Sequence, residues 1–196
     1  MLDRRSFLIR SGVAAVAFGV SPGGSAIASD TKGSVHHHVL SGLDGNPLAL
    51  SRFRGKVLLV VNTASKCAFT PQYEGLERLW RRYGSRGLVV IGVPSNDFGR
   101  QEPGDSGQIR EFCTQTYDVT FPMAGKTIVT GSAAHPLYRA FASRLGDDGV
   151  PGWNFHKVLI GRDGVPRAGF GSRIRPEDGR ITLTIEAALS DKAGSF

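Results

Sequence analysis

The sequence predicts an α/β fold with a central mixed sheet flanked by helices and preceded by an N-terminal β ribbon. Residues 57–61 and 88–93 form two continuous apolar runs, which are typical of parallel strands buried on both faces. A segment with helical spacing separates these runs, and two later apolar segments flank an Arg-Asp-Gly turn. At 196 residues, 40% of them hydrophobic, the chain has the size and composition of one globular domain.

The N-terminal half of this fold is expected to be the β ribbon followed by a βαβ unit. Short extended segments within residues 35–50 surround an Asp-Gly-Asn sequence, which favours a tight hairpin turn. Between the two buried strands, Thr70 and Pro71 provide an N-cap and a first-turn residue, and Gly84 is expected to stop the helix. A helix between neighbouring parallel strands makes a right-handed crossover.

The C-terminal half is expected to supply three helices and a hairpin. One helix begins near Asp105 or Ser106, because Ile109, Phe112 and Cys113 then fall on one face. The other expected elements are helices at 136–145 and 176–189 and strands at 157–160 and 165–170. A parallel βαβ half joined to a ββα half, in a chain of this size, is the thioredoxin-like architecture.

The first 28 residues resemble a bacterial twin-arginine (Tat) export leader. The adjacent Arg4 and Arg5 precede a short apolar run, and Ala-Ile-Ala at 26–28 offers a cleavage site. A membrane anchor is the alternative, but an arginine and a proline interrupt the run before it reaches about 20 residues. We expect residues 1–28 to be a cleaved signal peptide, residues 29–196 to be the mature domain, and the protein to pass the Tat translocon to the periplasm or another extracytoplasmic location.

Charge and cysteine content exclude several classes of function. The formal net charge is +7, but the basic residues are scattered without a Lys/Arg block, so we expect no nucleic-acid binding. Cys67 and Cys113 are too few for a disulfide framework or a thiolate zinc site. The three histidines at 36–38 would alternate in direction on a strand and could not converge on one ion. We therefore expect no metal, and a thiol is the candidate reactive group.

Cys67 lies where a reactive thiol is expected. It follows the strand at 57–61 after a short loop and precedes the helix that begins at Thr70 or Pro71. The unpaired N–H groups of that helix start and the neighbouring Lys66 favour the thiolate, which is the nucleophilic form. The alternative is a buried cysteine that acts as a small apolar residue, but the polar loop at a sheet edge favours the reactive thiol.

Three neutral hydrogen-bond donors are expected at the same sheet edge. Gln101 lies in the loop after the second parallel strand, while Trp153 and Asn154 precede the strand at 157–160, whose beginning reaches that edge if it is antiparallel. An indole N–H and two carboxamides can hold a thiolate and a reacting oxygen without competing as bases. Taken one at a time, each residue also has a purely structural explanation. Trp153 could pack in the core, Asn154 could form a turn, and Gln101 could be a solvated surface residue.

Three segments resemble the signature segments of the glutathione peroxidase family. They are residues 62–73 around Cys67, residues 94–104 around Gln101, and Trp153-Asn154-Phe155, within a similarity that covers residues 40–190. The resemblance implies a thioredoxin-like fold and a thiol-dependent peroxidase that reduces hydrogen peroxide and organic hydroperoxides in defence against oxidative stress. It makes Cys67 the peroxidatic residue, with Gln101, Trp153 and Asn154 as its catalytic partners.

The same resemblance implies a reductant and an oligomeric state. Members of the family use no prosthetic cofactor, and an external thiol, glutathione or a thioredoxin-like protein, restores the enzyme. The chain has a cysteine where other members carry selenocysteine. Between Tyr138 and Trp153 it lacks the insertion of the tetrameric members, which favours a monomer.

The resemblance leaves one catalytic step open, because many cysteine-containing members have a resolving cysteine before the Phe-Pro motif. The register to Phe121-Pro122 puts Thr114 at the usual resolving position and Cys113 one residue earlier. Helical spacing also turns Cys113 towards the core. We therefore favour an external thiol and keep Cys113 as a candidate resolving residue.

Two other functions are open from the residues alone. A thiol–disulfide oxidoreductase could use the same fold, but that chemistry normally needs Cys-x-x-Cys and position 70 is threonine. A non-enzymatic exported redox sensor or metal-binding module could use Cys67 and the histidines.

Overall fold

The computed structural model describes residues 32–191. The predicted signal peptide at residues 1–28 therefore lies outside the described residues. Within residues 32–191, no helix is long and apolar enough to cross a membrane.

A four-stranded mixed sheet forms the centre of the domain, as predicted. Its strands are β3 (Val57–Thr63), β4 (Leu88–Pro94), β5 (Lys157–Ile160) and β6 (Pro166–Phe170), in the order β4-β3-β5-β6. β3 pairs parallel with β4 and antiparallel with β5, and β6 pairs antiparallel with β5. Every residue of β3 and β4 is buried, which explains why both strands are continuous apolar runs.

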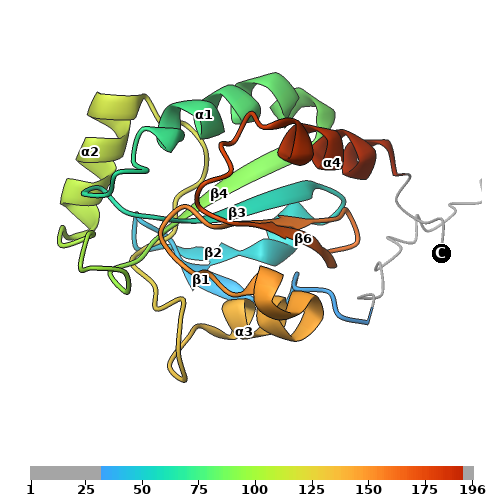
Figure 1. Cartoon of the computed structure of the whole chain (residues 1–196), viewed down its shortest axis with the longest axis horizontal. Coiled ribbons are helices and arrows are strands. Elements are labelled where there is room, and N and C mark those ends of the chain that lie inside the picture. Colours follow the sequence, from blue (N-terminus) through green and yellow to red (C-terminus); the bar gives the residue numbers. More distant parts are fainter. Residues whose placement is uncertain (1–31, 192–196) are drawn as a thin grey trace, which may run out of the picture.

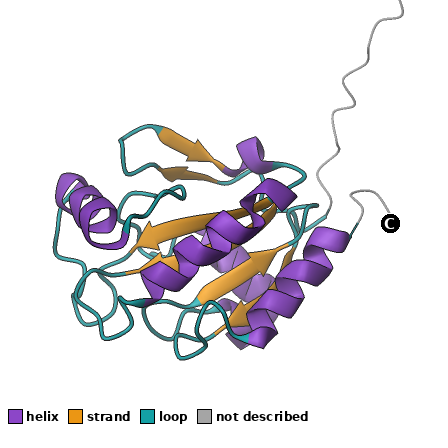
Figure 2. Ribbon diagram, turned by 90° about the horizontal axis from the view of Figure 1, so that it is seen from above, coloured by secondary structure: helices purple, strands orange, loops and turns teal. Residues whose placement is uncertain are grey.

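Helices and the β ribbon cover the two faces of the sheet (Figure 1). One face carries α1 (Gln72–Tyr83) and α4 (Gly179–Ser190), which cross it side by side in Figure 2. The other carries α3 (Pro136–Leu145) and the antiparallel ribbon of β1 (Val39–Ser41) and β2 (Pro47–Ala49). α2 (Ser106–Tyr117) lies at one end of the domain. Short 3-10 helices are η1 (Leu50–Phe53), η2 (Gly84–Arg86) and η3 (Gly146–Gly149).

Side chains alternate along β3 between two hydrophobic cores. Leu59 and Val61 belong to the cluster that contains residues of α1 and α4, whereas Leu58 and Val60 belong to the cluster with α3 and the ribbon. A single interior strand therefore contributes to both cores, and its end carries the candidate site.

The capping signals define the helix starts in most places. Asp105 is the N-cap of α2 and forms a capping box with Gln108, so the predicted start is confirmed. Ile109 and Cys113 are each 1% exposed, and Phe112 packs against the same core, as the helical spacing predicted.

Three local predictions were wrong by a few residues. α1 begins at Gln72 without a side-chain cap, because the Thr70 hydroxyl is bound to the preceding loop. β3 runs to Thr63, so the loop before Cys67 is shorter than expected. The last helix begins at Gly179 rather than 176, because Asp178 caps it.

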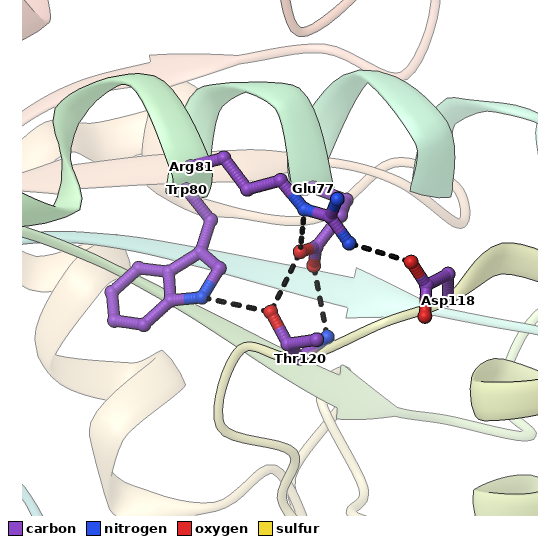
Figure 3. Close-up of polar contacts among 5 residues, drawn as sticks. All are labelled: Glu77, Trp80, Arg81, Asp118 and Thr120. Carbon is purple, nitrogen blue, oxygen red and sulfur yellow. Dashed lines mark hydrogen bonds and ion pairs between the residues drawn. The ribbon is translucent and has the colours of Figure 1, made fainter.

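A buried carboxylate joins α1 to the segment that follows α2 (Figure 3). The side chain of Glu77 is 6% exposed and accepts hydrogen bonds from the Thr120 backbone N–H (2.9 Å), the Thr120 hydroxyl (2.6 Å) and Arg81 Nε (2.7 Å). Burial pushes the pKa of Glu77 up, but these donors outweigh burial and hold the pKa below its ordinary value. Trp80 also donates to the Thr120 hydroxyl, and Arg81 pairs with Asp118.

We expect Glu77→Ala to lower the free energy of unfolding by about 1–3 kcal/mol, because it removes the carboxylate that accepts two hydrogen bonds from Thr120 and one from Arg81. Glu74→Ala is the matched control. Glu74 is on the same helix but exposed, and within residues 32–191 its carboxylate forms an ion pair with Arg78 alone, at 3.7 Å, so its loss should cost less than about 0.5 kcal/mol. Urea unfolding of the two variants measures the difference, and equal effects would contradict the assignment.

Candidate active site

The loop between β3 and α1 holds Cys67 at the carboxyl edge of the sheet. The Thr70 hydroxyl accepts from the backbone N–H of Cys67 (3.0 Å) and donates to the Ala64 carbonyl (2.9 Å). The backbone N–H of Phe69 points at the Cys67 sulfur, 3.4 Å away. The loop is thus held by its own hydrogen bonds, and one backbone donor is directed at the sulfur.

The loop after β4 is bound to the loop that carries Cys67. The backbone N–H of Lys66 donates to the Gln101 carbonyl (3.0 Å), and the Ser65 hydroxyl donates to the Glu102 carboxylate (2.7 Å). Glu102 is 1% exposed, and burial raises its pKa. The two loops expected from the parallel pairing therefore meet directly.

Asn62, at the end of β3, holds the Trp-Asn-Phe segment against the same edge. Its amide nitrogen donates to the Trp153 carbonyl (3.0 Å), and its amide oxygen accepts from the His156 backbone N–H (3.1 Å). The backbone N–H of Phe155 donates to the Asn62 carbonyl (2.6 Å). We did not single out Asn62 from the sequence, although a carboxamide at the end of a buried apolar strand is a recognisable signal.

Gln101 and Asn154 form a carboxamide pair across the site. The Asn154 amide nitrogen donates to the Gln101 side-chain oxygen (2.9 Å), and Asn154 is fully buried. Because this bond occupies the oxygen of Gln101, the amide nitrogen of Gln101 is the atom left to donate to a reacting group. Gln101 is therefore half-buried and bound rather than a solvated surface residue.

Trp153 lies at the surface rather than in the core. It is 39% exposed, and its ring packs against Phe98 with 5.6 Å between the centroids. Within residues 32–191 its indole N–H donates to no protein group. The indole nitrogen is thus available to an incoming molecule.

The second cysteine is sealed inside the domain. Cys113 is 1% exposed on the inner side of α2, as predicted, and it forms no disulfide with Cys67. Burial raises the pKa of the Cys113 thiol to about 11. Cys113 is therefore protonated and inaccessible while α2 is folded.

The histidines at 36–38 precede β1 instead of lying on a strand, which corrects the geometry assumed from the sequence. Burial, with His37 and His135 close by, lowers the pKa of His38 to about 4. Across residues 32–191, no group of three or more His, Cys, Asp or Glu side chains could hold a metal ion.

Fold and site together define a thioredoxin-like protein with one candidate nucleophile, Cys67, and a threonine at the position where a Cys-x-x-Cys motif has its second cysteine. The sequence matches the glutathione peroxidase family over residues 35–142, more than half of the chain. The chain belongs to the glutathione peroxidase family.

Individual relatives agree with this assignment. A hydroperoxy fatty acid reductase of Synechocystis is 42% identical over 171 residues, covering 83% of this chain and 100% of the relative. A thioredoxin/glutathione peroxidase of Escherichia coli is 40% identical over 174 residues, covering 78% and 95%. A glutathione peroxidase-like peroxiredoxin of Schizosaccharomyces pombe is 46% identical over 149 residues, covering 74% and 92%.

Solved structures confirm the fold. The crystal structure of T. cruzi GPX1 matches with a TM-score of 0.63 at 32% identity, over 80% of this chain and 96% of that one. A thioredoxin-family thiol:disulfide interchange protein of Chlorobium tepidum matches with a TM-score of 0.57 at 19% identity, over 78% and 92%. The second likeness shows the shared thioredoxin-like fold alone.

A buried lysine fixes the loop beside the site. Lys157 is the first residue of β5 and is fully buried, and its ammonium nitrogen donates to the Ile174 carbonyl (2.5 Å). Burial lowers the pKa of Lys157 from 10.5 to about 7. Between these two pH values, the unfolded chain binds a proton that the folded chain has released.

We therefore expect the stability of the protein, relative to Lys157→Met, to rise as the pH increases from about 7 to about 10. Below pH 7 Lys157 is charged in both the folded and the unfolded states, so the folded state carries the full free-energy cost of burying the charge. Urea unfolding at a series of pH values, with a reductant present, measures the difference. Lys56→Met, which removes an exposed lysine, is the control, and a flat difference for Lys157→Met would contradict the argument.

Proposed function

We propose that Cys67 is the peroxidatic residue of this enzyme and that Gln101, Trp153 and Asn154 assist it. As a member of the glutathione peroxidase family, the chain is a thiol-dependent peroxidase. The Cys67 thiolate attacks one oxygen of the O–O bond, the bond breaks, and water or an alcohol leaves after taking up a proton. Cys67 is oxidised to a sulfenic acid, and the hydroperoxide is reduced.

The observation that carries this proposal is the convergence of three segments on one sheet edge. The loop of Cys67 is bonded to the loop of Gln101, whose side chain is bonded in turn to Asn154. Neutral amide donors at this edge can stabilise the negative charge that develops on the leaving oxygen. Trp153 supplies a further N–H from the third segment.

The oxidised enzyme requires an external thiol, and we propose glutathione or a thioredoxin-like protein for that role. Relatives are named for peroxidase activity with both kinds of reductant. No prosthetic group takes part in this scheme. The proposed substrates are hydrogen peroxide and organic hydroperoxides, which places the enzyme in defence against oxidative stress.

The first test is Cys67→Ser, which should abolish peroxide reduction and leave the fold intact, because a serine hydroxyl is a far weaker nucleophile than a thiolate. Gln101→Ala and Asn154→Ala should slow oxidation of Cys67 by about ten- to a thousandfold. Stopped-flow measurement of the second-order rate constant gives these values, and circular dichroism controls for folding. Turnover by Cys67→Ser would refute the assignment.

The second test concerns Cys113. Since this thiol is buried and protonated, we expect one equivalent of peroxide to leave Cys67 as a sulfenic acid or as a mixed disulfide with an added thiol. Peptide mass mapping identifies the product. A linked Cys67–Cys113 peptide as the main product, with stalled turnover in Cys113→Ser, would make Cys113 the resolving residue and require α2 to open.

The alternative oxidoreductase function has less support. Thr70 stands where a second redox cysteine would be needed, and its hydroxyl is committed to the backbone of Cys67 and Ala64. For a sensor or metal-binding module, the described residues supply no cluster of ligands. Consumption of peroxide by the purified protein separates the enzyme from these alternatives.

We also propose that residues 1–28 direct export by the twin-arginine route and that the mature domain is a periplasmic or extracytoplasmic monomer. Arg4→Lys combined with Arg5→Lys should block export, because the arginine pair is the recognised feature of such leaders. N-terminal sequencing of the exported protein should begin near Ser29. Export that persists in the double variant, or a mature chain that retains the leader, would contradict this proposal.

A further inference from the structure

Glu102 is a buried acid that directly follows Gln101 in the chain and that the proposed reaction does not use. It is 1% exposed, and its backbone N–H donates to the side-chain oxygen of Asn96 (2.9 Å). Its carboxylate oxygen Oε1 accepts from the Ser65 hydroxyl (2.7 Å), whereas Oε2 is buried and has no hydrogen-bond partner within residues 32–191. Burying an acid that has one side-chain hydrogen bond costs free energy, so stability alone does not account for Glu102 at this position.

The backbone on the other side of Gln101 is strained. Arg100 has a positive φ of 54°, which is uncommon for a residue with a side chain, and Gly99 before it has a φ of 62°. The backbone N–H of Gln101 closes this turn by donating to the Phe98 carbonyl (3.3 Å). A strained turn of this kind keeps its shape only where the residues around it are fixed.

The same turn determines where the Gln101 side chain lies. A Cβ atom built on Gly99 would lie 3.5 Å from both Cγ and Nε2 of Gln101, so the side chain folds back over the glycine. The side-chain oxygen of Gln101 also accepts from the Asn154 amide nitrogen (2.9 Å). The direction of the remaining donor, the Gln101 amide nitrogen, therefore depends on the turn and on Asn154 together.

Glu102 fixes this turn to the loop that carries Cys67. The Ser65 hydroxyl, two residues before Cys67, donates to the Glu102 carboxylate, and the backbone N–H of Lys66 donates to the Gln101 carbonyl (3.0 Å). The Lys66 bond fixes the carbonyl of Gln101, and the Ser65 bond fixes the residue after it. Together the two bonds restrict rotation of the Gln101 backbone at the end of the strained turn.

The surroundings of Glu102 favour the neutral form of its carboxyl group. Burial raises the pKa of Glu102 and outweighs the Ser65 hydroxyl and the Lys126 ammonium, which act in the opposite direction. The buried side chains of Tyr73 and Cys113, which interact electrostatically with Glu102, supply no positive charge. Glutamine has the shape of a neutral glutamic acid and keeps an acceptor oxygen, so Glu102→Gln is a conservative change.

We propose that Glu102 is a positioning residue for Gln101 in the peroxidase reaction. Its bond to Ser65 holds the strained turn in place, and the turn directs the Gln101 amide nitrogen to the oxygen that leaves from the peroxide. Glu102 itself touches neither the peroxide nor the sulfur and exchanges no proton in the reaction. This proposal rests on the proposed function and adds to it a residue that acts through Gln101.

Stopped-flow oxidation of Cys67 by hydrogen peroxide tests this role. Glu102→Ala should lower the second-order rate constant about tenfold, because a small displacement of a group that assists the reaction is costly. Glu102→Gln should restore most of the parent rate constant, since it keeps the acceptor for Ser65. Ser65→Ala removes the same hydrogen bond from its partly exposed end and should also slow oxidation, so the test does not depend on the folding of Glu102→Ala alone.

A double-mutant cycle with Gln101→Ala separates positioning from a general loosening of the fold. If Glu102 acts through Gln101, Glu102→Ala should change the rate constant by less than about twofold in the Gln101→Ala background. A general loss of structure would lower the rate constant by the same factor in both backgrounds. Glu77→Ala is the matched control, because it removes a buried carboxylate on α1 and should lower the stability without slowing oxidation.

Equal slowing by Glu102→Ala in the parent protein and in the Gln101→Ala background would overturn the proposal. So would a parent-like rate constant in Glu102→Ala or in Ser65→Ala, and none of these results affects the peroxidase assignment. If Gln101→Ala itself fails to slow oxidation, the proposed role of Gln101 falls together with that of Glu102. If hydrogen peroxide fails to oxidise Cys67 in the parent protein, the peroxidase function falls, so the failures are distinguishable.

Discussion

The carboxamide of Asn62 is the contact on which the geometry of the site depends. β3 is parallel to β4 and antiparallel to β5, so the end of β3 faces the beginning of β5 at one sheet edge. Asn62 bridges that junction with its side-chain amide nitrogen, its side-chain amide oxygen and its backbone carbonyl. These bonds hold the Trp153–His156 segment in place. The hydrogen bond between Asn154 and Gln101 then links this segment to the loop after β4. A buried amide with both ends satisfied is a strong positioning device, because any shift strands a polar atom in the interior.

The sequence was sufficient to predict the fold, because residues that are buried in the fold form recognisable apolar patterns along the chain. Two uninterrupted apolar runs identified the parallel strands, and the Asp105 capping residue placed α2 correctly. The prediction that Thr70 caps α1 was wrong for a physical reason. The Thr70 hydroxyl could cap the following helix or bind the preceding loop, and the outcome depends on the position of Ala64, which local spacing does not encode. The same holds for Asn62, whose partners lie more than ninety residues away in the chain. The loops carrying Cys67 and Gln101 met as the parallel pairing predicted, but the bond between Gln101 and Asn154 could be seen only in three dimensions.

Two buried charged side chains of the domain differ in how well their charge is compensated. Glu77 is buried with three donors and keeps its charge at low cost, whereas Lys157 is buried with one carbonyl acceptor and loses its proton more easily. Both hold a neighbouring segment in place: Glu77 holds the chain after α2, and Lys157 holds the loop that contains Ile174.

The burial of Cys113 separates the oxidation of the two cysteine thiols in time. Cys67 is 8% exposed in the loop between β3 and α1, so its oxidation does not require α2 to open. An oxidant reaches Cys113 only during those brief intervals in which α2 opens, so the second reaction is governed by the free energy of a local unfolding event. The packing of α2 therefore sets the order of oxidation. Brief exposure to an oxidant modifies Cys67, and only sustained exposure also modifies Cys113.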